Sequence, residues 1–386
     1  MAYKTSALGF VIVLGVVSLC ADATYEGARS ITGAYLGALG ASGTVVGLVA
    51  GLGELIGYGL RLVTGYLSDR TRQYWGITTL GYFINTAVVP LLALTGTWQA
   101  AAGLMIAERT GKAIRTPPRD VLLSHAAMRV GRGFGFGLHE AMDQIGAVLG
   151  PLMVAAMLSW QYSYRGGFAI LAIPALVGLS VLLIVQRIYP NPREFEPPTA
   201  DLDTTGLPHL FWIYLGAIAL IAAGYADFPL IAFHLQQTGV NTGSQIPLLY
   251  ALAMGVDAIA ALLFGRWFDR VGLWSLMLAV SLSLFFAPLV FLGNAQFAVF
   301  GMVLWGIGMG AQESIMKAAV AGIVPANRRG SAFGIFNTGY GLAWFAGSTL
   351  MGILYDVSRP LLIIFSVLIQ FAAIPVLFIV LRRFRS

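Results

Sequence analysis

Long apolar stretches separated by short polar segments run through this sequence from one end to the other. Twelve such stretches can be delimited, and each is about as long as the roughly 20 apolar residues that an α-helix needs to cross a bilayer. They lie near 6–28, 42–64, 76–96, 98–123, 133–159, 166–187, 209–236, 244–265, 273–293, 295–324, 331–355 and 360–381. They are too long for transmembrane strands and lack strand alternation, so the pattern predicts an all-α polytopic membrane protein with twelve transmembrane helices.

One connection is longer than the others and is rich in proline and acidic residues. It covers residues 188–208 and is the one credible linker in the chain. The pattern therefore predicts an N-terminal six-helix bundle over 1–187, a cytoplasmic linker over 188–208, and a C-terminal six-helix bundle over 209–386.

The composition agrees with a membrane protein. Hydrophobic residues make up 58% of the chain and charged residues only 10%, whereas soluble domains carry about 25% charged residues. This argues against a soluble enzyme and excludes a disordered chain. The single cysteine, Cys20, excludes a disulfide framework or a thiolate metal cluster. The apolar N-terminus is interpreted as an uncleaved first helix.

Lys and Arg are distributed unevenly among the connections. One alternate set of connections holds sixteen of them, and the other holds only Arg29, Arg165 and Arg359. Because cytoplasmic loops are enriched in Lys and Arg, both termini and the linker are expected to be cytoplasmic, in a plasma (inner) membrane. The net charge of +6 then needs no nucleic-acid partner. The sixteen are Lys4, Arg70, Arg72, Arg115, Arg119, Arg129, Arg132, Arg187, Arg193, Arg266, Arg270, Arg328, Arg329, Arg382, Arg383 and Arg385.

Three short motifs occur twice, about 200 residues apart. The loops after the second and eighth stretches read GYLSDRTRQYW (65–75) and GRWFDRVGLW (265–274). A Glu-x-x-x-Lys motif recurs in the fourth and tenth stretches, and RGFGFG (132–137) recurs as RGSAFG (329–334). The matches indicate an internal duplication, which in transporters places the binding site between two pseudo-symmetric repeats.

With these motifs the sequence resembles the major facilitator superfamily over essentially the whole chain. The loop signature of that family is matched at Gly65, Leu67, Asp69 and Arg70, while Arg72, Gln73 and Tyr74 depart from its later positions. The second copy retains Gly265, Asp269, Arg270 and Gly272. Gly146, Gly150 and Pro151 resemble the antiporter-associated signature, without its trailing glycines, and Arg109 stands where the family's fourth-helix arginine is expected.

The loop signature suggests a conformational latch made of Gly65, Asp69, Arg70, Gly265, Asp269 and Arg270. A carboxylate at a helix-to-loop junction can dock on a neighbouring helix N-terminus, or pair with an arginine, in one state of the transporter. The alternative is that these charges only anchor the helix ends at the membrane edge. The segment IRTPPRD (114–120) is interpreted as a loop cap that ends the fourth helix, within reach of Asp69.

Many ionisable residues fall inside the apolar stretches, where each costs ~2.5 kcal/mol or more. They are expected to bind substrate or protons around a water-accessible cavity. Glu108 and Lys112, like Glu313 and Lys317, are four residues apart and share a helical face. They either neutralise each other within a helix or face the cavity, which the resemblance implies is lined by the first, fourth, seventh and tenth helices. The full set is Asp22, Glu26, Glu54, Glu108, Arg109, Lys112, His139, Glu140, Asp143, Asp227, Asp257, Glu313 and Lys317.

His139, Glu140 and Asp143 lie together on the fifth stretch, and His139 and Asp143 share a face. A carboxylate beside an imidazole suits a proton carrier, and both groups are also metal ligands. A hydrogen-bonded network between helices is the third possibility. With no further histidine evidently near, no metal site is predicted. Asp22 and Asp227 hold similar places in the first and seventh helices. Two roles are open for them: a salt bridge at the outer rim of the protein, or an outside gate where protons enter.

The sequence is thus interpreted as a secondary transporter that works by alternating access. No Gly-rich phosphate loop is present, so an ion gradient is the expected energy source. Abundant buried acids favour proton-coupled antiport, with export of a small organic solute. The alternatives are a divalent-metal or metal-chelate exporter and a non-transporting receptor or scaffold. A monomer in the bilayer, without enzymatic activity and without a cofactor other than the coupling proton, is expected.

Overall fold

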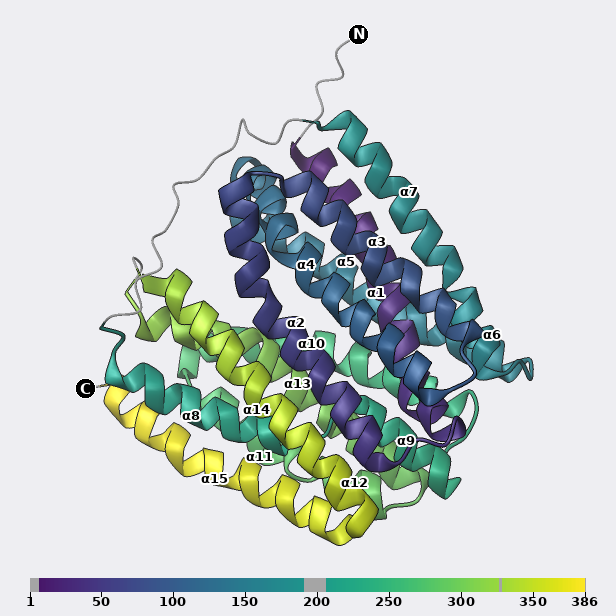
Figure 1. Ribbon diagram of the computed structural model, residues 1–386. Coiled ribbons are helices and arrows are strands. Elements are labelled where there is room, and N and C mark those ends of the chain that lie inside the picture. The colour runs from purple at the N-terminus through teal and green to yellow at the C-terminus, as the bar shows by residue number, and fades with distance from the viewer. Residues whose placement is uncertain (1–6, 191–205, 326–327, 386) are drawn as a thin grey trace. The chain divides into compact units, whose positions relative to one another are not determined.

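The computed structural model describes residues 7–190, 206–325 and 328–385, and every regular element within these ranges is helical (Figure 1). The prediction of an all-α fold is confirmed. The elements are α1 (Ala7–Ala38), α2 (Gly43–Thr71), α3 (Tyr74–Leu91), η1 (Leu92–Leu94), α4 (Trp98–Val130), α5 (Arg132–Ser159), α6 (Tyr164–Ile170), α7 (Ala172–Ile188), α8 (His209–Gly224), α9 (Phe228–Thr238), α10 (Gln245–Val271), α11 (Trp274–Ser283), α12 (Phe286–Leu292), α13 (Ala295–Ile323), α14 (Arg329–Val357) and α15 (Arg359–Arg385).

The twelve predicted spans correspond to these helices, and four of the spans are interrupted. The interruptions separate α3 from η1, α6 from α7, α8 from α9, and α11 from α12. In the seventh span the backbone leaves the helix at Tyr225 and re-enters it after Asp227, with Pro229 in the first turn of α9. Asp227 is therefore the N-cap residue of α9 and not an interior helical position.

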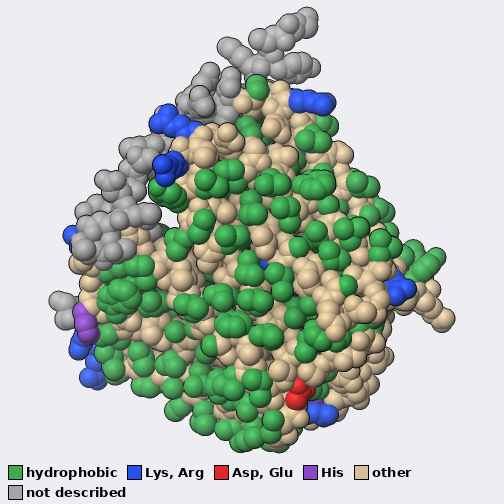
Figure 2. Space-filling model, in the orientation of Figure 1, with side chains coloured by type: hydrophobic (Ala, Val, Ile, Leu, Met, Phe, Trp, Pro, Cys, Tyr) green, Lys and Arg blue, Asp and Glu red, His purple; other side chains and the backbone are tan. Residues whose placement is uncertain are grey.

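Ten helical segments of the described chain are long and apolar enough to cross a membrane. The two predicted spans outside this group are α4, which carries a run of charged residues, and α14. Figure 2 shows a face covered largely by hydrophobic side chains, with few Lys and Arg and hardly any Asp or Glu. A large apolar surface of this kind is what a lipid environment requires. The chain is a multi-pass membrane protein.

The helices pack into two compact units. The first comprises 1–31 and 59–199, and the second comprises 32–58 and 200–386. The end of α1 and the start of α2 thus belong with the second unit, whereas the sequence assigned them to the first bundle. Most of the predicted linker, residues 191–205, lies outside the described residues, so the division at 188–208 stays a prediction.

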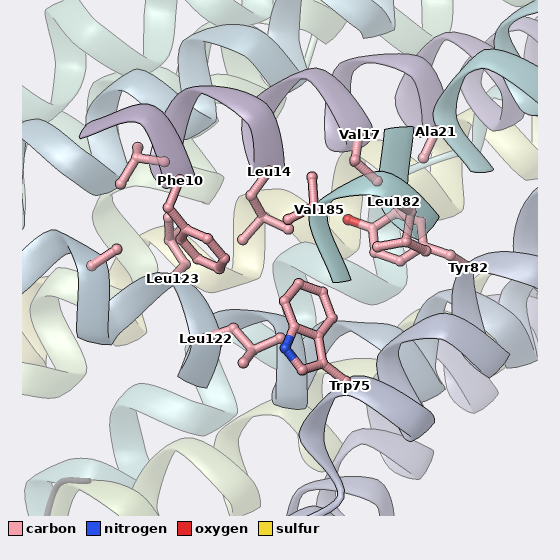
Figure 3. Packing of buried hydrophobic residues seen from close by; sticks show 12 residues of the cluster. Phe10, Leu14, Val17, Ala21, Trp75, Tyr82, Leu122, Leu123, Leu182 and Val185 are labelled. Carbon is pink, nitrogen blue, oxygen red and sulfur yellow. The ribbon is translucent and has the colours of Figure 1, made fainter. Parts of the chain in front are cut away.

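The core of the first unit is built around α1 (Figure 3). Phe10, Leu14, Val17 and Ala21 follow one another at helical spacing, so they form a single stripe. Trp75 and Tyr82 of α3, Leu122 and Leu123 of α4, and Leu182 and Val185 of α7 cover this stripe. This packing holds α1 against α4, which positions the charged residues further along both helices.

Glycines allow the fifth span of each predicted half to approach the first span of the same half closely. A Cβ at Gly150 of α5 would collide with the carbonyl oxygen of Ala23, and one at Gly146 with that of Leu19. In the second unit, a Cβ at Gly347 of α14 would collide with the carbonyl oxygen of Ala223 in α8. The glycine signature therefore has a packing role in contacts between membrane helices. Its occurrence in both units agrees with the predicted duplication.

Candidate proton and substrate site

Helix α4 does not end at the IRTPPRD segment, so the prediction of a loop cap there is wrong. The helix continues to Val130 through Pro117 and Pro118. A proline frees the carbonyl four residues earlier, and in this structure the hydroxyl of Thr64 in α2 donates a hydrogen bond to the carbonyl of Ala113, 3.0 Å away. A side-chain donor of this kind lets a membrane helix tolerate proline.

The longer α4 moves two arginines from a presumed loop into the interior. Arg115 is only 1% exposed, and the side chain of Arg119 is 13% exposed. Removing both from the cytoplasmic set lowers its count from 16 to 14, against 3 in the other set. The orientation of the termini stays a prediction, which now rests on a difference of 14 against 3 Lys and Arg residues between the two sets of connections.

The buried side chains of α4 meet those of α1 in a regular series of contacts, here called the α1–α4 ladder. Arg119 Nη1 donates to Ser18 Oγ at 3.2 Å, Arg115 Nη2 lies 3.4 Å from Asp22 Oδ1, and Lys112 Nζ lies 4.0 Å from Glu26 Oε1. Arg29 interacts electrostatically with Glu108 at the far end. Residue numbers rise along α1 as they fall along α4, which is the register of antiparallel helices.

The closest partners of Glu108 and Lys112 differ from the intrahelical pairing that the sequence left open as one alternative. Lys112 forms its ion pair with Glu26 of α1. Glu108 accepts a 2.7 Å hydrogen bond from Asn85 of α3 and lies 3.5 Å from Arg109. Lys112 is thus paired with another helix of the first unit, whereas Glu108 has its nearest cation on its own helix. The expectation that they face the opposite repeat across a cavity stays a prediction.

Tyr25 is the centre of the ladder. Its hydroxyl donates a 2.9 Å hydrogen bond to Asp22 Oδ2. Three cations of α4 surround its ring: Lys112 Nζ lies 3.9 Å from the centroid, and the guanidinium carbons of Arg115 and Arg109 lie 5.8 and 5.9 Å from it. The negative face of an aromatic ring attracts cations. Tyr25 therefore helps to hold three like charges close together.

Two substitutions of Tyr25 separate its ring from its hydroxyl. Tyr25→Phe keeps the ring beside the cations, whereas Tyr25→Leu removes both ring and hydroxyl. Because each cation–π contact is worth about 0.5–2 kcal/mol, we expect Tyr25→Leu to lower the thermal unfolding temperature in a fixed detergent clearly more than Tyr25→Phe. Equal losses would show that the ring does not stabilise the cations.

Helix α5 contributes a second acidic group to the same unit. Asp143 Oδ2 lies 3.4 Å from His139 Nδ1 and 3.6 Å from Arg119 Nη1. Arg119 also holds Asp120 at 2.7 Å, so this one guanidinium is shared by two carboxylates. The structure thus brings His139 and Asp143 together with the ladder, while Glu140 of the same helix is exposed.

Several buried polar atoms of this cluster have no hydrogen-bond partner among the described residues. They are Arg115 Nε and Nη1, His139 Nε2 and Asp143 Oδ1. Buried polar groups are nearly always satisfied by protein or by water. Three charged or titratable side chains with unused hydrogen-bonding capacity therefore mark a polar region within the first unit that suits water or a polar solute.

The predicted site residues of the second unit lie in different surroundings. Glu54 and Asp257 are buried, and Trp344 Nε1 donates to buried Asp227 at 3.4 Å. Glu313 and Lys317 are exposed, unlike Glu108 at the corresponding place of the first unit. The acids lie near aromatic rings: Glu54 and Glu313 act electrostatically on Tyr340, and Asp257 and Glu313 act on Tyr225.

The charged residues of the signature loops are exposed at the ends of α2 and α10, while Gly65 and Gly265 are half-buried. Asp69 accepts a 3.4 Å hydrogen bond from Tyr74, and Arg70 donates to Tyr66 at 3.3 Å. Asp269 and Arg270 are exposed. Docking of Asp69 on a helix N-terminus stays a prediction. The signature glycines pack alike in the two units, because a Cβ on Gly65 would lie 3.6 Å from Pro117 and one on Gly265 would lie 3.5 Å from Ser314.

A metal site in the described part of the chain would require side chains arranged to bind the ion. No group of three or more His, Cys, Asp or Glu side chains there is arranged to hold a metal ion. The pair His139 and Asp143 is joined by Arg119, which repels a cation.

Sequence reasoning missed the buried positions of Arg115 and Arg119. The available signal was the spacing of 108, 112, 115 and 119, which is the repeat of a single helical face continuing past the prolines. Interpreting the two prolines as a helix end concealed that signal.

A family model and two kinds of relative match this chain. The model for the Major Facilitator Superfamily matches residues 14–348 and 213–386. An uncharacterised protein of Mycobacterium tuberculosis is 43% identical over 97% of this chain and 93% of its own length. Multidrug resistance protein MdtH of Photorhabdus laumondii is 24% identical over 92% of this chain and 85% of its own.

The fold agrees with solved structures of transporters. The crystal structure of the nucleoside transporter NupG superimposes with a TM-score of 0.72. The match covers 98% of this chain and 99% of that chain, at 12% sequence identity, so the likeness concerns the fold alone. Together with the twelve predicted spans and the repeated motifs, these matches establish that the chain belongs to the Major Facilitator Superfamily of transporters.

Proposed function

We propose that this transporter is a proton-coupled antiporter that exports a small organic solute by alternating access. The observation that supports this most directly is the α1–α4 ladder with its extension to α5. Its inter-helix ion pairs are 3.4–4.0 Å long, whereas strong charge-assisted hydrogen bonds are about 2.7–2.9 Å. Loose pairs of this kind can exchange partners at small cost.

Protonation of one carboxylate would change the partners of its neighbours. If Asp143 takes up a proton, Arg119 loses its charge attraction to Asp143 and retains its 2.7 Å contact with Asp120. If Asp22 takes up a proton, the attraction between Asp22 and Arg115 is lost in the same way. Because these residues lie on α1, α4 and α5, a proton can alter how three helices pack.

Two further observations support antiport with export. Gly146 and Gly150, which resemble the antiporter signature, pack α5 directly on α1, the helix that carries Asp22. One relative is called a multidrug resistance protein, a name that agrees with export. The inner membrane, with both termini cytoplasmic, is the proposed location.

Proteoliposomes with a pH-sensitive dye inside test the proposal. A thermal-shift screen of wild-type protein selects solutes, with ethidium and benzoate included as cationic and anionic probes. We expect proton movement that depends on a selected solute and falls at least about tenfold in Asp22→Asn and Asp143→Asn. Gln296→Ala is the control, because Gln296 is an exposed residue at the start of α13. Solute transport without proton movement, or unchanged rates in both variants, would contradict proton coupling.

A further inference from the structure

The end of α1 and the start of α2 dock closely on helices of the second unit. Residues 32–58 belong to that unit. A Cβ on Gly33 of α1 would collide with the carbonyl of Pro229 in α9, and one on Gly37 would lie 2.7 Å from the ring of Phe233. The two helix backbones therefore approach as closely as glycine permits.

The first half of α2 repeats this arrangement against α14. Gly43, Gly47 and Gly51 recur every fourth residue and form one stripe. A Cβ on Gly47 would collide with the carbonyl of Ser348, and one on Gly51 would lie 2.9 Å from the carbonyl oxygen of Phe345. The stripe thus forms a tight seam between the start of α2 and the end of α14.

A carboxylate closes this seam at its end. Asp356, in the last turn of α14, accepts hydrogen bonds from the backbone N–H of Gly43 at 2.9 Å and of Thr44 at 2.7 Å. It also accepts one from the hydroxyl of Thr44 at 2.6 Å. These N–H groups belong to the first turn of α2, where the helix has unsatisfied donors and a positive dipole end. Asp356, which belongs to α14, accepts hydrogen bonds from these donors of α2 and places its negative charge at the positive end of the α2 dipole.

The same chemistry was predicted for Asp69, which lies near the opposite end of α2. There the carboxylate accepts a longer hydrogen bond from Tyr74, the first residue of α3. Asp356 is a carboxylate that the structure does place on a helix N-terminus. The acid that holds the start of α2 at Gly43 comes from a distant helix.

We propose that Asp356 and the first turn of α2 form the latch that keeps the α2–α14 seam closed at this end of the transporter. The inference rests on the proposed alternating access, in which the predicted N-terminal bundle, which carries α2, and the predicted C-terminal bundle, which carries α14, part when the site opens towards this side. Parting would separate a carboxylate from three donors at once. The glycine stripe lets the two helices pack closely in the closed seam. The hydrogen bonds to Asp356 lower the equilibrium population of the open seam.

Distance measurements between spin labels test this without a solute or a proton gradient. Leu48 of α2 and Ile353 of α14 are 41% and 42% exposed, so cysteines there, in a Cys20→Ser background, can carry labels. In nanodiscs we expect one dominant short distance while Asp356 is present. Asp356→Ala should increase the population of a longer distance about fivefold, which corresponds to the contribution of about 1 kcal/mol typical of a capping side chain. Asp356→Asn should increase it less.

Gln296→Ala, at an exposed residue at the start of α13, is the control and should leave the distances unchanged. Identical distributions with and without the Asp356→Ala change, in proteins of equal monodispersity, would overturn the latch. Should Asp356→Ala not fold, the same comparison with Asp356→Asn and with Thr44→Val, which removes the hydroxyl donor, decides the question. If the protein shows no proton coupling in the proteoliposome assay but shows the expected distances, the latch proposal stands and only the proposal of proton coupling fails.

Discussion

Replacing Arg115 by methionine is expected to be among the most destabilising single changes in this chain. The guanidinium is 1% exposed, lies 3.4 Å from Asp22, and has its Cζ 4.4 Å from the ring centre of Tyr82. Methionine has a similar length but leaves the carboxylate of Asp22 buried without its cation. Removing one partner of a buried ion pair costs about 3–5 kcal/mol. The change should lower the thermal unfolding temperature in detergent strongly, or prevent recovery of folded protein.

A double variant shows whether the loss comes from the stranded charge. Arg115→Met with Asp22→Asn removes both charges, so we expect it to recover a large part of the stability lost in Arg115→Met alone. Arg270→Met, at an exposed position of α10, should have little effect. If the double variant is no more stable than Arg115→Met, the pairing with Asp22 is not what Arg115 contributes.

Replacing Gly150 by leucine is expected to prevent α5 from packing on α1. A Cβ at this position collides with the backbone carbonyl of Ala23, which cannot move aside as a flexible side chain would. Even Gly150→Ala should separate the two helices and lower the unfolding temperature, and leucine should abolish folded, monodisperse protein. Overpacking of a tight interface typically costs about 1–3 kcal/mol and sometimes more.

Gly137→Ala on the same helix is the matched control, because a Cβ there meets nothing within 4 Å. It should be neutral or slightly stabilising, since alanine favours a helix over glycine by about 1 kcal/mol. Gly347→Ala, which meets the carbonyl of Ala223 in the second unit, should resemble Gly150→Ala. Equal stability of Gly150→Ala and Gly137→Ala would exclude a close-packing role for the glycine signature.

The candidate site was predictable in part, and the reason differs from residue to residue. Asp22, Glu26, Glu108, Lys112, His139 and Asp143 stand out because a charge inside an apolar stretch is costly and needs a compensating environment. Arg115 and Arg119 were assigned to a loop because consecutive prolines usually end a helix. Their place in the interior depends on the hydroxyl of Thr64, which is 49 residues from Ala113 in the sequence and restores a hydrogen bond that the prolines removed.

The repeated motifs predicted equal roles for Glu108 and Glu313, which the structure does not give them. Glu108 is buried against Asn85, whereas Glu313 is exposed. A motif specifies the spacing along one helix. The environment of each side chain is set by the residues that neighbouring helices present, and these have diverged between the two copies.

The sequence by itself determined that this chain is a helical membrane protein built from twelve spans and two related halves. That information is local. A long apolar segment in lipid must pair its backbone N–H and C=O groups within its own helix wherever it occurs in the chain. A repeated motif can be recognised from the sequence alone. Only the tertiary structure decided that Arg115 meets Asp22, that three cations gather around Tyr25, and that Asp356 holds the start of α2. These contacts join residues that are 84 to 313 positions apart in the sequence. Which charged residues meet depends on the register between neighbouring helices. That register is set by close glycine contacts between helices, and no local sequence pattern encodes it.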